Sequence, residues 1–222
     1  VCPQSQQPEL KHAAVKLLKA ELPWQLVAAA WLPEADALSA MQRLRALMPA
    51  FAYAHCVPFG HEPVPRGVVG VLLRAAAHEP ASDELLARIE ATLDIGGSKV
   101  LRYADARRGQ RRAMRLAATD TKQAAGATLD AFLLAGDTAA ATWVLGLLQD
   151  GLPVRPFGHA LLSGRATPPS ALPPRAPQVC NCLDVDQGAI VAALVHCHGD
   201  NDSRLAQLQH RLACGTQCGS CL

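Results

Sequence analysis

The stretch WQLVAAAW, residues 24–31, is a compact apolar run with the length of a buried β-strand. It opens a series of short elements that the spacing of apolar residues predicts along the chain. In order, these are a strand over 24–31, a helix over 36–48, strands over 51–57 and 68–73, a helix over 82–93 and a strand over 99–103. Helices and strands mixed in this way predict the α+β class.

The predicted order β-α-β-β-α-β is that of the ferredoxin-like split fold. The first helix is expected to end at Pro49, because proline stops a helical pattern. Ser82 is expected to cap the second helix, with Asp83 and Glu84 favourably placed in its first turn. The apolar face of the first helix is predicted to consist of Leu38, Met41, Leu44 and Met48.

A β-hairpin and helix connector is predicted to extend this core. Its elements are strands over 111–116 and 128–134 and a helix over 138–149. Asp137 is expected to cap the helix, and Trp143 to lie on its buried stripe rather than to stack on a ligand. The α+β unit is therefore expected to span residues 21–162.

Residues 102–115, RYADARRGQRRAMR, carry six arginines and one acidic residue, a local charge of +5. Two interpretations stay open. This arginine strip is either the solvated face of a hairpin or a docking patch for a small acidic electron carrier, in which Arg107, Arg108, Arg111 and Arg112 make the contacts. Nucleic acid is disfavoured, because Tyr103 is the only aromatic residue in the strip.

Composition limits the classes of function. The 222 residues are 50% hydrophobic and 18% charged, which excludes intrinsic disorder. The longest apolar runs fall short of the roughly 20 residues of a membrane span, and a net charge of +2 argues against nucleic-acid or lipid binding. No export signal opens the chain, so a cytoplasmic location is expected, and both ends suggest a fragment of a longer protein.

Cysteines are concentrated at the C-terminal end of the chain. Residues 163–178 are rich in proline and predict an extended linker. Six of the eight cysteines follow it, within residues 179–222. A disulfide scaffold would spread its cysteines through a small secreted chain, so this clustering indicates a separate sulfur-ligand module.

The module contains Cys180-x-Cys182 and Cys218-x-x-Cys221. Four thiolates suit either zinc or an iron–sulfur cluster. Zinc ribbons usually pair two Cys-x-x-Cys knuckles, whereas a Cys-x-Cys and one knuckle suit two irons with two thiolates each. An iron–sulfur cluster is therefore favoured, with zinc and redox-active thiols as the alternatives.

Two helices are predicted between these motifs. Asp186 is expected to cap the first, and Asp202 or Ser203 the second. Gly215 and Gly219 flank the second loop, so backbone N–H groups can approach the sulfur atoms. The predicted apolar faces are Ile190, Val191, Leu194 and Val195 on the first helix, and Leu205, Leu208 and Leu212 on the second.

The motifs CNCL and CGTQCGSCL resemble those of the bacterioferritin-associated-ferredoxin type of [2Fe–2S] domain. The resemblance implies a small helical [2Fe–2S]-binding domain over 179–222. It also implies that Cys214 is not a ligand. The cluster ligands that it implies are Cys180, Cys182, Cys218 and Cys221.

Two further segments resemble the bacterial assimilatory nitrate reductase catalytic subunit, of the molybdopterin oxidoreductase family. QQPELKHAAV (6–15) is similar to the closing motif of its molybdopterin-dinucleotide-binding domain, and GDTAAATWVLGLLQDG (136–151) to the connector before its [2Fe–2S] domain. The resemblance implies that residues 1–20 are the tail of the cofactor domain and that Lys11 contacts the molybdenum cofactor.

The same resemblance implies the cofactors and partners of the full enzyme. Molybdenum-bis-molybdopterin guanine dinucleotide and a [4Fe–4S] cluster would belong to the rest of the nitrate reductase chain, and the [2Fe–2S] cluster would accept electrons from a ferredoxin, flavodoxin or flavoprotein. This fragment alone would not reduce nitrate. Two alternatives remain: a part of the assimilatory nitrite reductase large subunit, and a non-catalytic iron–sulfur binding module.

Overall fold

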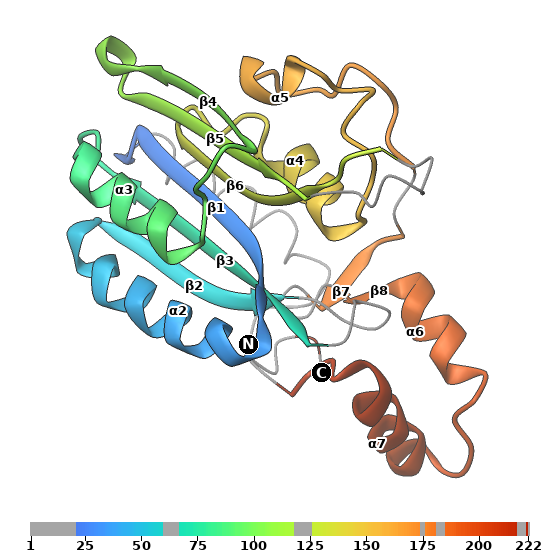
Figure 1. Ribbon diagram of the computed structural model, residues 1–222. Coiled ribbons are helices and arrows are strands. Elements are labelled where there is room, and N and C mark those ends of the chain that lie inside the picture. Colours follow the sequence, from blue (N-terminus) through green and yellow to red (C-terminus); the bar gives the residue numbers. More distant parts are fainter. Residues whose placement is uncertain are drawn as a thin grey trace.

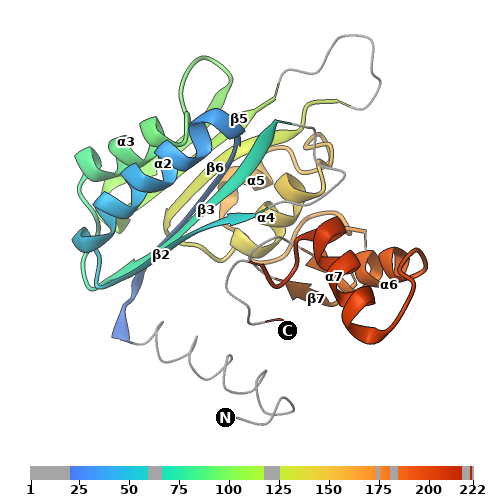
Figure 2. The same cartoon turned by 90° about the horizontal axis from the view of Figure 1, so that it is seen from below.

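The computed structural model describes residues 21–59, 67–117, 126–173, 176–180, 185–216 and 221. Its main unit is a six-stranded antiparallel sheet with helices on both faces (Figures 1 and 2), so the fold is α+β as predicted. Within the described part of the chain, no helix is long and apolar enough to cross a membrane. The elements of this unit are β1 (Trp24–Pro33), α2 (Glu34–Leu47), η2 (Met48–Ala50), β2 (Tyr53–Phe59), β3 (Val68–Ala77), α3 (Asp83–Thr92), β4 (Val100–Asp105), η3 (Ala106–Arg108), β5 (Gln110–Leu116), β6 (Leu129–Gly136), α4 (Ala141–Gln149) and α5 (Ala160–Ser163).

The strands lie in the order β2-β3-β1-β6-β5-β4. The predicted sequence of elements is present, but a ferredoxin-like sheet would place β4 directly beside β1. That place is taken by β6. The reason is the burial that each strand needs: β6, LDAFLLAG, is apolar on both faces, whereas β4 is mostly exposed and suits the sheet edge.

Each face of the sheet has its own core. Alternation along β1 sends Leu26 and Ala28 into the core beneath α2 and α3, and Val27 and Ala29 into the core beneath α4 and α5. Trp143 lies buried in the second core, as predicted. Covered faces on both sides therefore explain why the β1 sequence is an unbroken apolar run rather than an alternating one.

Helix α2 packs on a face one position away from the predicted one. Leu38 is 64% exposed, while Ala37, Ala40, Met41, Leu44 and Leu47 are buried. The predicted face was chosen from the large apolar residues alone and did not include Ala37 and Ala40. Their small side chains let the backbone of α2 approach the sheet closely, so they determine the buried face.

The predicted helix caps have mixed outcomes. The Ser82 hydroxyl accepts a hydrogen bond from the Leu85 N–H at 3.2 Å, which confirms the α3 cap. Asp137 does not cap α4, which begins three residues later than predicted. Its carboxylate instead accepts from the Ala139 N–H at 3.0 Å and stabilises the turn that precedes the helix.

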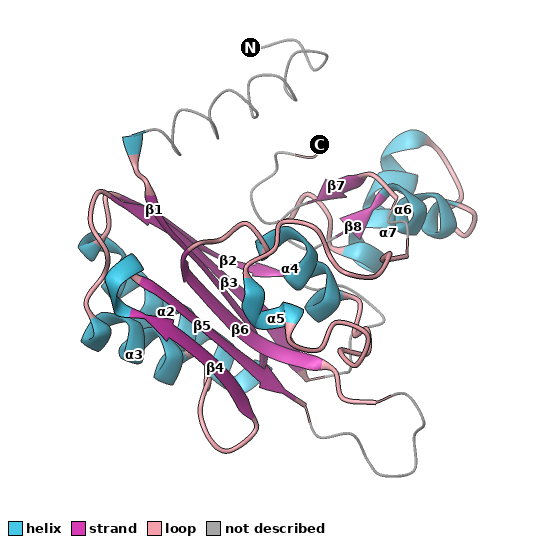
Figure 3. Cartoon of the chain, turned by 90° about the horizontal axis from the view of Figure 1, so that it is seen from above, coloured by secondary structure: helices cyan, strands magenta, loops and turns pink. Residues whose placement is uncertain are grey.

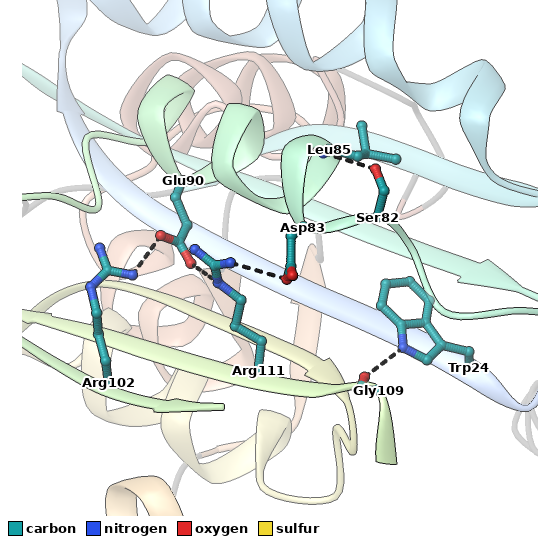
Figure 4. Close-up of polar contacts among 8 residues, drawn as sticks. All are labelled: Trp24, Ser82, Asp83, Leu85, Glu90, Arg102, Gly109 and Arg111. Atoms are coloured by element: carbon teal, nitrogen blue, oxygen red, sulfur yellow. Dashed lines mark hydrogen bonds and ion pairs between the residues drawn. The ribbon is translucent and has the colours of Figure 1, made fainter. Parts of the chain in front are cut away.

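Most arginines of the strip are paired with carboxylates of the same chain. Glu90 on α3 is 4% exposed and accepts from Arg102 at 2.6 Å and from Arg111 at 2.7 Å (Figure 4), tying the helix to strands β4 and β5. The hydrogen bond with Glu90 is the main cause that raises the pKa of Arg111. Arg112 is also buried, so the strip is not a uniformly solvated face.

Two more arginines of the strip are also paired, Arg112 on the opposite face of the sheet and Arg115 beside the end of α3. The guanidinium of Arg112 lies 2.8 Å from the carboxylate of Asp137 and donates to the Leu162 carbonyl at 2.7 Å. Arg115 pairs with Asp94 at 2.6 Å and with Asp130 at 2.7 Å. Since Arg111 and Arg112 are engaged internally, the docking hypothesis retains only the exposed Arg107 and Arg108 on η3.

The C-terminal unit comprises β7 (Gln178–Cys180), β8 (Val185–Asp186), α6 (Gln187–Leu194) and α7 (Asn201–Leu212), grouped together in Figure 3. The described residues between α5 and β7 contain no helix or strand. The Asp186 carboxylate accepts from the Ala189 N–H at 2.7 Å, which confirms the α6 cap. The second predicted helix is present as α7, but its predicted cap is wrong: Asp200 is the cap, and the Ser203 N–H donates to its carboxylate at 2.8 Å.

The apolar face of α6 is narrower than predicted. Ile190 and Leu194 pack on the small core of the unit, but Val191 and Val195 are exposed, the latter by 70%. Leu205 of α7 is exposed as well, while Leu208 is buried. A core of this size covers only one side of each helix, so Val191, Val195 and Leu205 remain exposed to solvent.

Candidate metal centre

The structure places two of the four predicted ligands. Cys180 is the last residue of β7 and is 2% exposed. Cys221 is partly buried and packs against the same small core. Cys182 and Cys218 lie outside the described residues, and so does the predicted cofactor contact Lys11.

Cys180 and Cys221 approach each other closely. Burial is the largest cause that raises the pKa of Cys221, and a hydrogen bond with the Cys180 side chain raises it further. The N–H of Gly215 donates to Cys221 and opposes this shift. The two ends of the cysteine module, far apart in sequence, therefore meet at one point of the fold.

Cys214 belongs to the same group. Its side chain is buried, and burial followed by the charge of Cys180 raises its pKa. Cys214 also contributes to the raised pKa of Cys221. Cys180, Cys214 and Cys221, named here the thiol cluster, thus interact with one another. The resemblance implied no ligand role for Cys214, although its position in the run CGTQCGSC already placed it close to the second motif.

The backbone after α7 directs this approach. Helix α7 ends at Leu212, and Ala213 adopts a left-handed conformation with φ of 53°, while its N–H donates to the Gln209 carbonyl. This reversal turns Cys214 back into the core. Gly215 follows with φ of 81°, a value that glycine adopts without strain, and its N–H reaches Cys221.

Cys197 is buried in the same small core. Its thiol donates to the Ala193 carbonyl at 3.3 Å, one turn back along the chain. Cys56 lies in the main unit, where burial raises the pKa of its thiol to about 11 and Arg45 partly opposes the shift. Neither residue takes part in the thiol cluster.

The donor chemistry of the thiol cluster suits a soft metal centre. Buried thiols with raised pKa values stay protonated at neutral pH, and a bound cation makes thiolates favourable by supplying the missing positive charge. Within the described ranges, no three or more His, Cys, Asp or Glu side chains are arranged to hold a metal ion. The two ligands outside those ranges are therefore needed to complete the predicted set.

No protein-family model matches the chain. No curated protein and no solved structure matches it either. The interpretation of the centre accordingly depends on its cysteine spacing and on the contacts of the thiol cluster.

Proposed function

We propose that the C-terminal unit binds a [2Fe–2S] cluster through Cys180, Cys182, Cys218 and Cys221 and serves in electron transfer. The observation that carries the proposal is the contact between Cys180 and Cys221 within one buried core. These residues belong to the two separate cysteine motifs, and a shared cluster requires the motifs to meet. When bound, such a cluster supplies one-electron transfer.

The surroundings of the sulfur atoms support the same proposal. The Gly215 N–H donates to Cys221, and a donor of this kind stabilises negative charge on a thiolate. Val185 and Leu208 contribute apolar cover to the small core. Cover of this kind excludes water from the sulfur atoms.

We propose further that the chain is the C-terminal, electron-accepting portion of a molybdenum-dependent assimilatory nitrate reductase. The support is the resemblance of residues 6–15 and 136–151 to that enzyme, together with the cysteine motifs. A ferredoxin, flavodoxin or flavoprotein would supply the electrons. The molybdenum cofactor and the site of nitrate reduction would belong to the part of the enzyme that precedes this chain.

Reconstitution of the full chain under anaerobic conditions tests the cluster. Iron and sulfide should each approach about two per chain, with visible absorption that bleaches on reduction. Cys180→Ser and Cys221→Ser should lose the cluster. Cys197→Ser is the matched control, because Cys197 is buried in the same core but donates to a carbonyl of its own segment. Tightly bound zinc without sulfide would contradict the proposal.

Cys214→Ser decides how the thiol cluster is used. If the ligands are the four cysteines of the two motifs, this variant keeps its iron and sulfide. Loss of the cluster in Cys214→Ser together with retention in Cys218→Ser would mean that the ligand set is wrong.

A different assay addresses the nitrate reductase context. In the intact enzyme, Cys182→Ala should abolish nitrate reduction with the physiological donor. Turnover with a small reduced dye that reaches upstream centres directly should continue. Equal loss of both activities with the molybdenum cofactor still loaded would show that the module is part of the catalytic unit.

A further inference from the structure

Arg74 differs from the paired arginines of the sheet. Arg102, Arg111, Arg112 and Arg115 each have a carboxylate partner between 2.6 and 2.8 Å away. Arg74 extends from β3, the second strand of the sheet, and no carboxylate of the described residues forms an ion pair with it. Its side chain is exposed. A cation on the sheet surface is thus left without a counter-charge from this part of the chain.

His55 and Tyr53 lie beside Arg74 on the neighbouring strand. His55 is the direct cross-strand partner of Arg74, and Tyr53 follows two positions away on the same side of β2. The Tyr53 hydroxyl lies 3.2 Å from Nδ1 of His55, and the two rings meet edge to face. When the phenol donates to Nδ1 of the neutral imidazole, Nε2 carries the ring proton and remains available as a donor.

Among the described elements, no helix lies over this side of the sheet at the start of β2. Alternation places Arg74 on the same side as Leu72, which faces the core beneath α4. Figure 2 shows that the start of β2 lies away from α4 and α5. On β1, the residues opposite Arg74 and Ala76 are the uncharged Val27 and Gln25. The three polar side chains therefore lie together beside uncharged residues of β1.

The electrostatics of this group favour an anion. Burial and then the charge of Arg74 lower the pKa of His55. The protein packed around its guanidinium lowers the pKa of Arg74 itself, and only Tyr53 opposes this effect. The guanidinium is exposed enough to meet a solute, yet it has lost part of its hydration. Partial desolvation of a cation without a counter-charge costs free energy, which a bound anion would recover.

We propose that Arg74, His55 and Tyr53 form a binding site for an oxyanion, the charged group being a carboxylate or a phosphate. A guanidinium presents two parallel N–H donors that match either group. The imidazole Nε2–H supplies a further donor from the adjacent strand, and the phenol O–H of Tyr53 is used to hold the ring in this tautomer. The site consists of residues of β2 and β3 and uses none of the cysteines, so it is independent of the proposed iron–sulfur function.

Titration of the full chain with inorganic phosphate, and separately with acetate, tests the site. The readout is the NMR signal of the His55 ring, with fitted dissociation constants. Saturable shifts are expected, and the anion should raise the pKa of His55 by adding negative charge beside it. Saturable binding of phosphate alone would indicate a phosphate ligand, and tighter binding of acetate than of phosphate would indicate a carboxylate.

Variants distinguish a specific site from general attraction. Arg74→Gln should weaken binding at least about tenfold, the usual size of a lost charge-assisted hydrogen bond. Arg88→Gln removes one positive charge from an exposed position on α3 and should leave the dissociation constant unchanged. Absence of saturation with both anions, or equal weakening in the two variants, would overturn the proposal.

Discussion

Glu90 should be the most sensitive charged residue of the main unit. It is buried and bridges two arginines, at 2.6 Å to Arg102 and 2.7 Å to Arg111. Glu90→Gln keeps the size of the side chain and removes its charge. Breaking a buried pair in this way costs about 3–5 kcal/mol. The Arg102 side chain is 44% exposed and can be solvated, so we expect a loss near the lower limit, about 3 kcal/mol.

Urea unfolding of the apo chain, followed by far-UV circular dichroism, measures this loss. For a chain of this length it corresponds to a fall in melting temperature of about 6–12 °C. The double variant Glu90→Gln/Arg111→Gln should show a coupling energy of at least about 1 kcal/mol, because the two residues act as one unit. Glu84→Gln is the control: this exposed first-turn residue should cost at most about 0.5 kcal/mol. A Glu90→Gln variant within 1 kcal/mol of the parent, or a coupling near zero, would refute the argument.

Three further outcomes are expected. Between pH 9 and about 11 the Cys56 thiol stays protonated in the folded chain but ionises in the unfolded chain. The native state then binds more protons, so the free energy of unfolding falls as pH rises through this window. Urea unfolding at pH 8 and pH 11 should show a smaller fall in Cys56→Ala than in the parent. Gly70→Ala should destabilise the chain by about 1–3 kcal/mol, since the added methyl group would meet the buried Phe59 ring, whereas Gly67→Ala would meet no side chain and tests only the cost of a positive φ. Ala213→Gly should stabilise the C-terminal unit by about 1 kcal/mol in native-state hydrogen exchange, because glycine adopts the left-handed conformation without strain; a destabilised α7 would contradict this.

Most elements of the main unit could be predicted from sequence because their signals are local. The apolar run at 24–31 and the Ser82 cap each depend on a few neighbouring residues, and both are present where the sequence places them. The cap of α7 was predicted wrongly because several neighbouring residues suit the N-cap position equally well. Asp200 rather than Asp202 or Ser203 caps α7, although all three side chains suit the position.

The candidate site was predictable only in part. Cysteine spacing predicts a sulfur-ligand module, because the type and separation of the candidate ligands are read directly from the sequence. The approach of Cys214 to Cys180 was not predictable, because it depends on the left-handed turn at Ala213 and on the packing of α7 against α6. Likewise, the charge count at residues 102–115 could not distinguish paired arginines from free ones.

The order of helices and strands, the α+β class and the grouping of the cysteines follow from residue type and short-range periodicity, so they can be derived without the structure. Only the tertiary structure decided that β6 and not β4 lies beside β1. That choice compares strands distant in sequence: the strand with two apolar faces must lie where helices cover both. The same holds for Glu90 and Arg111, whose pairing depends on α3 lying across β5 and so has no local signal.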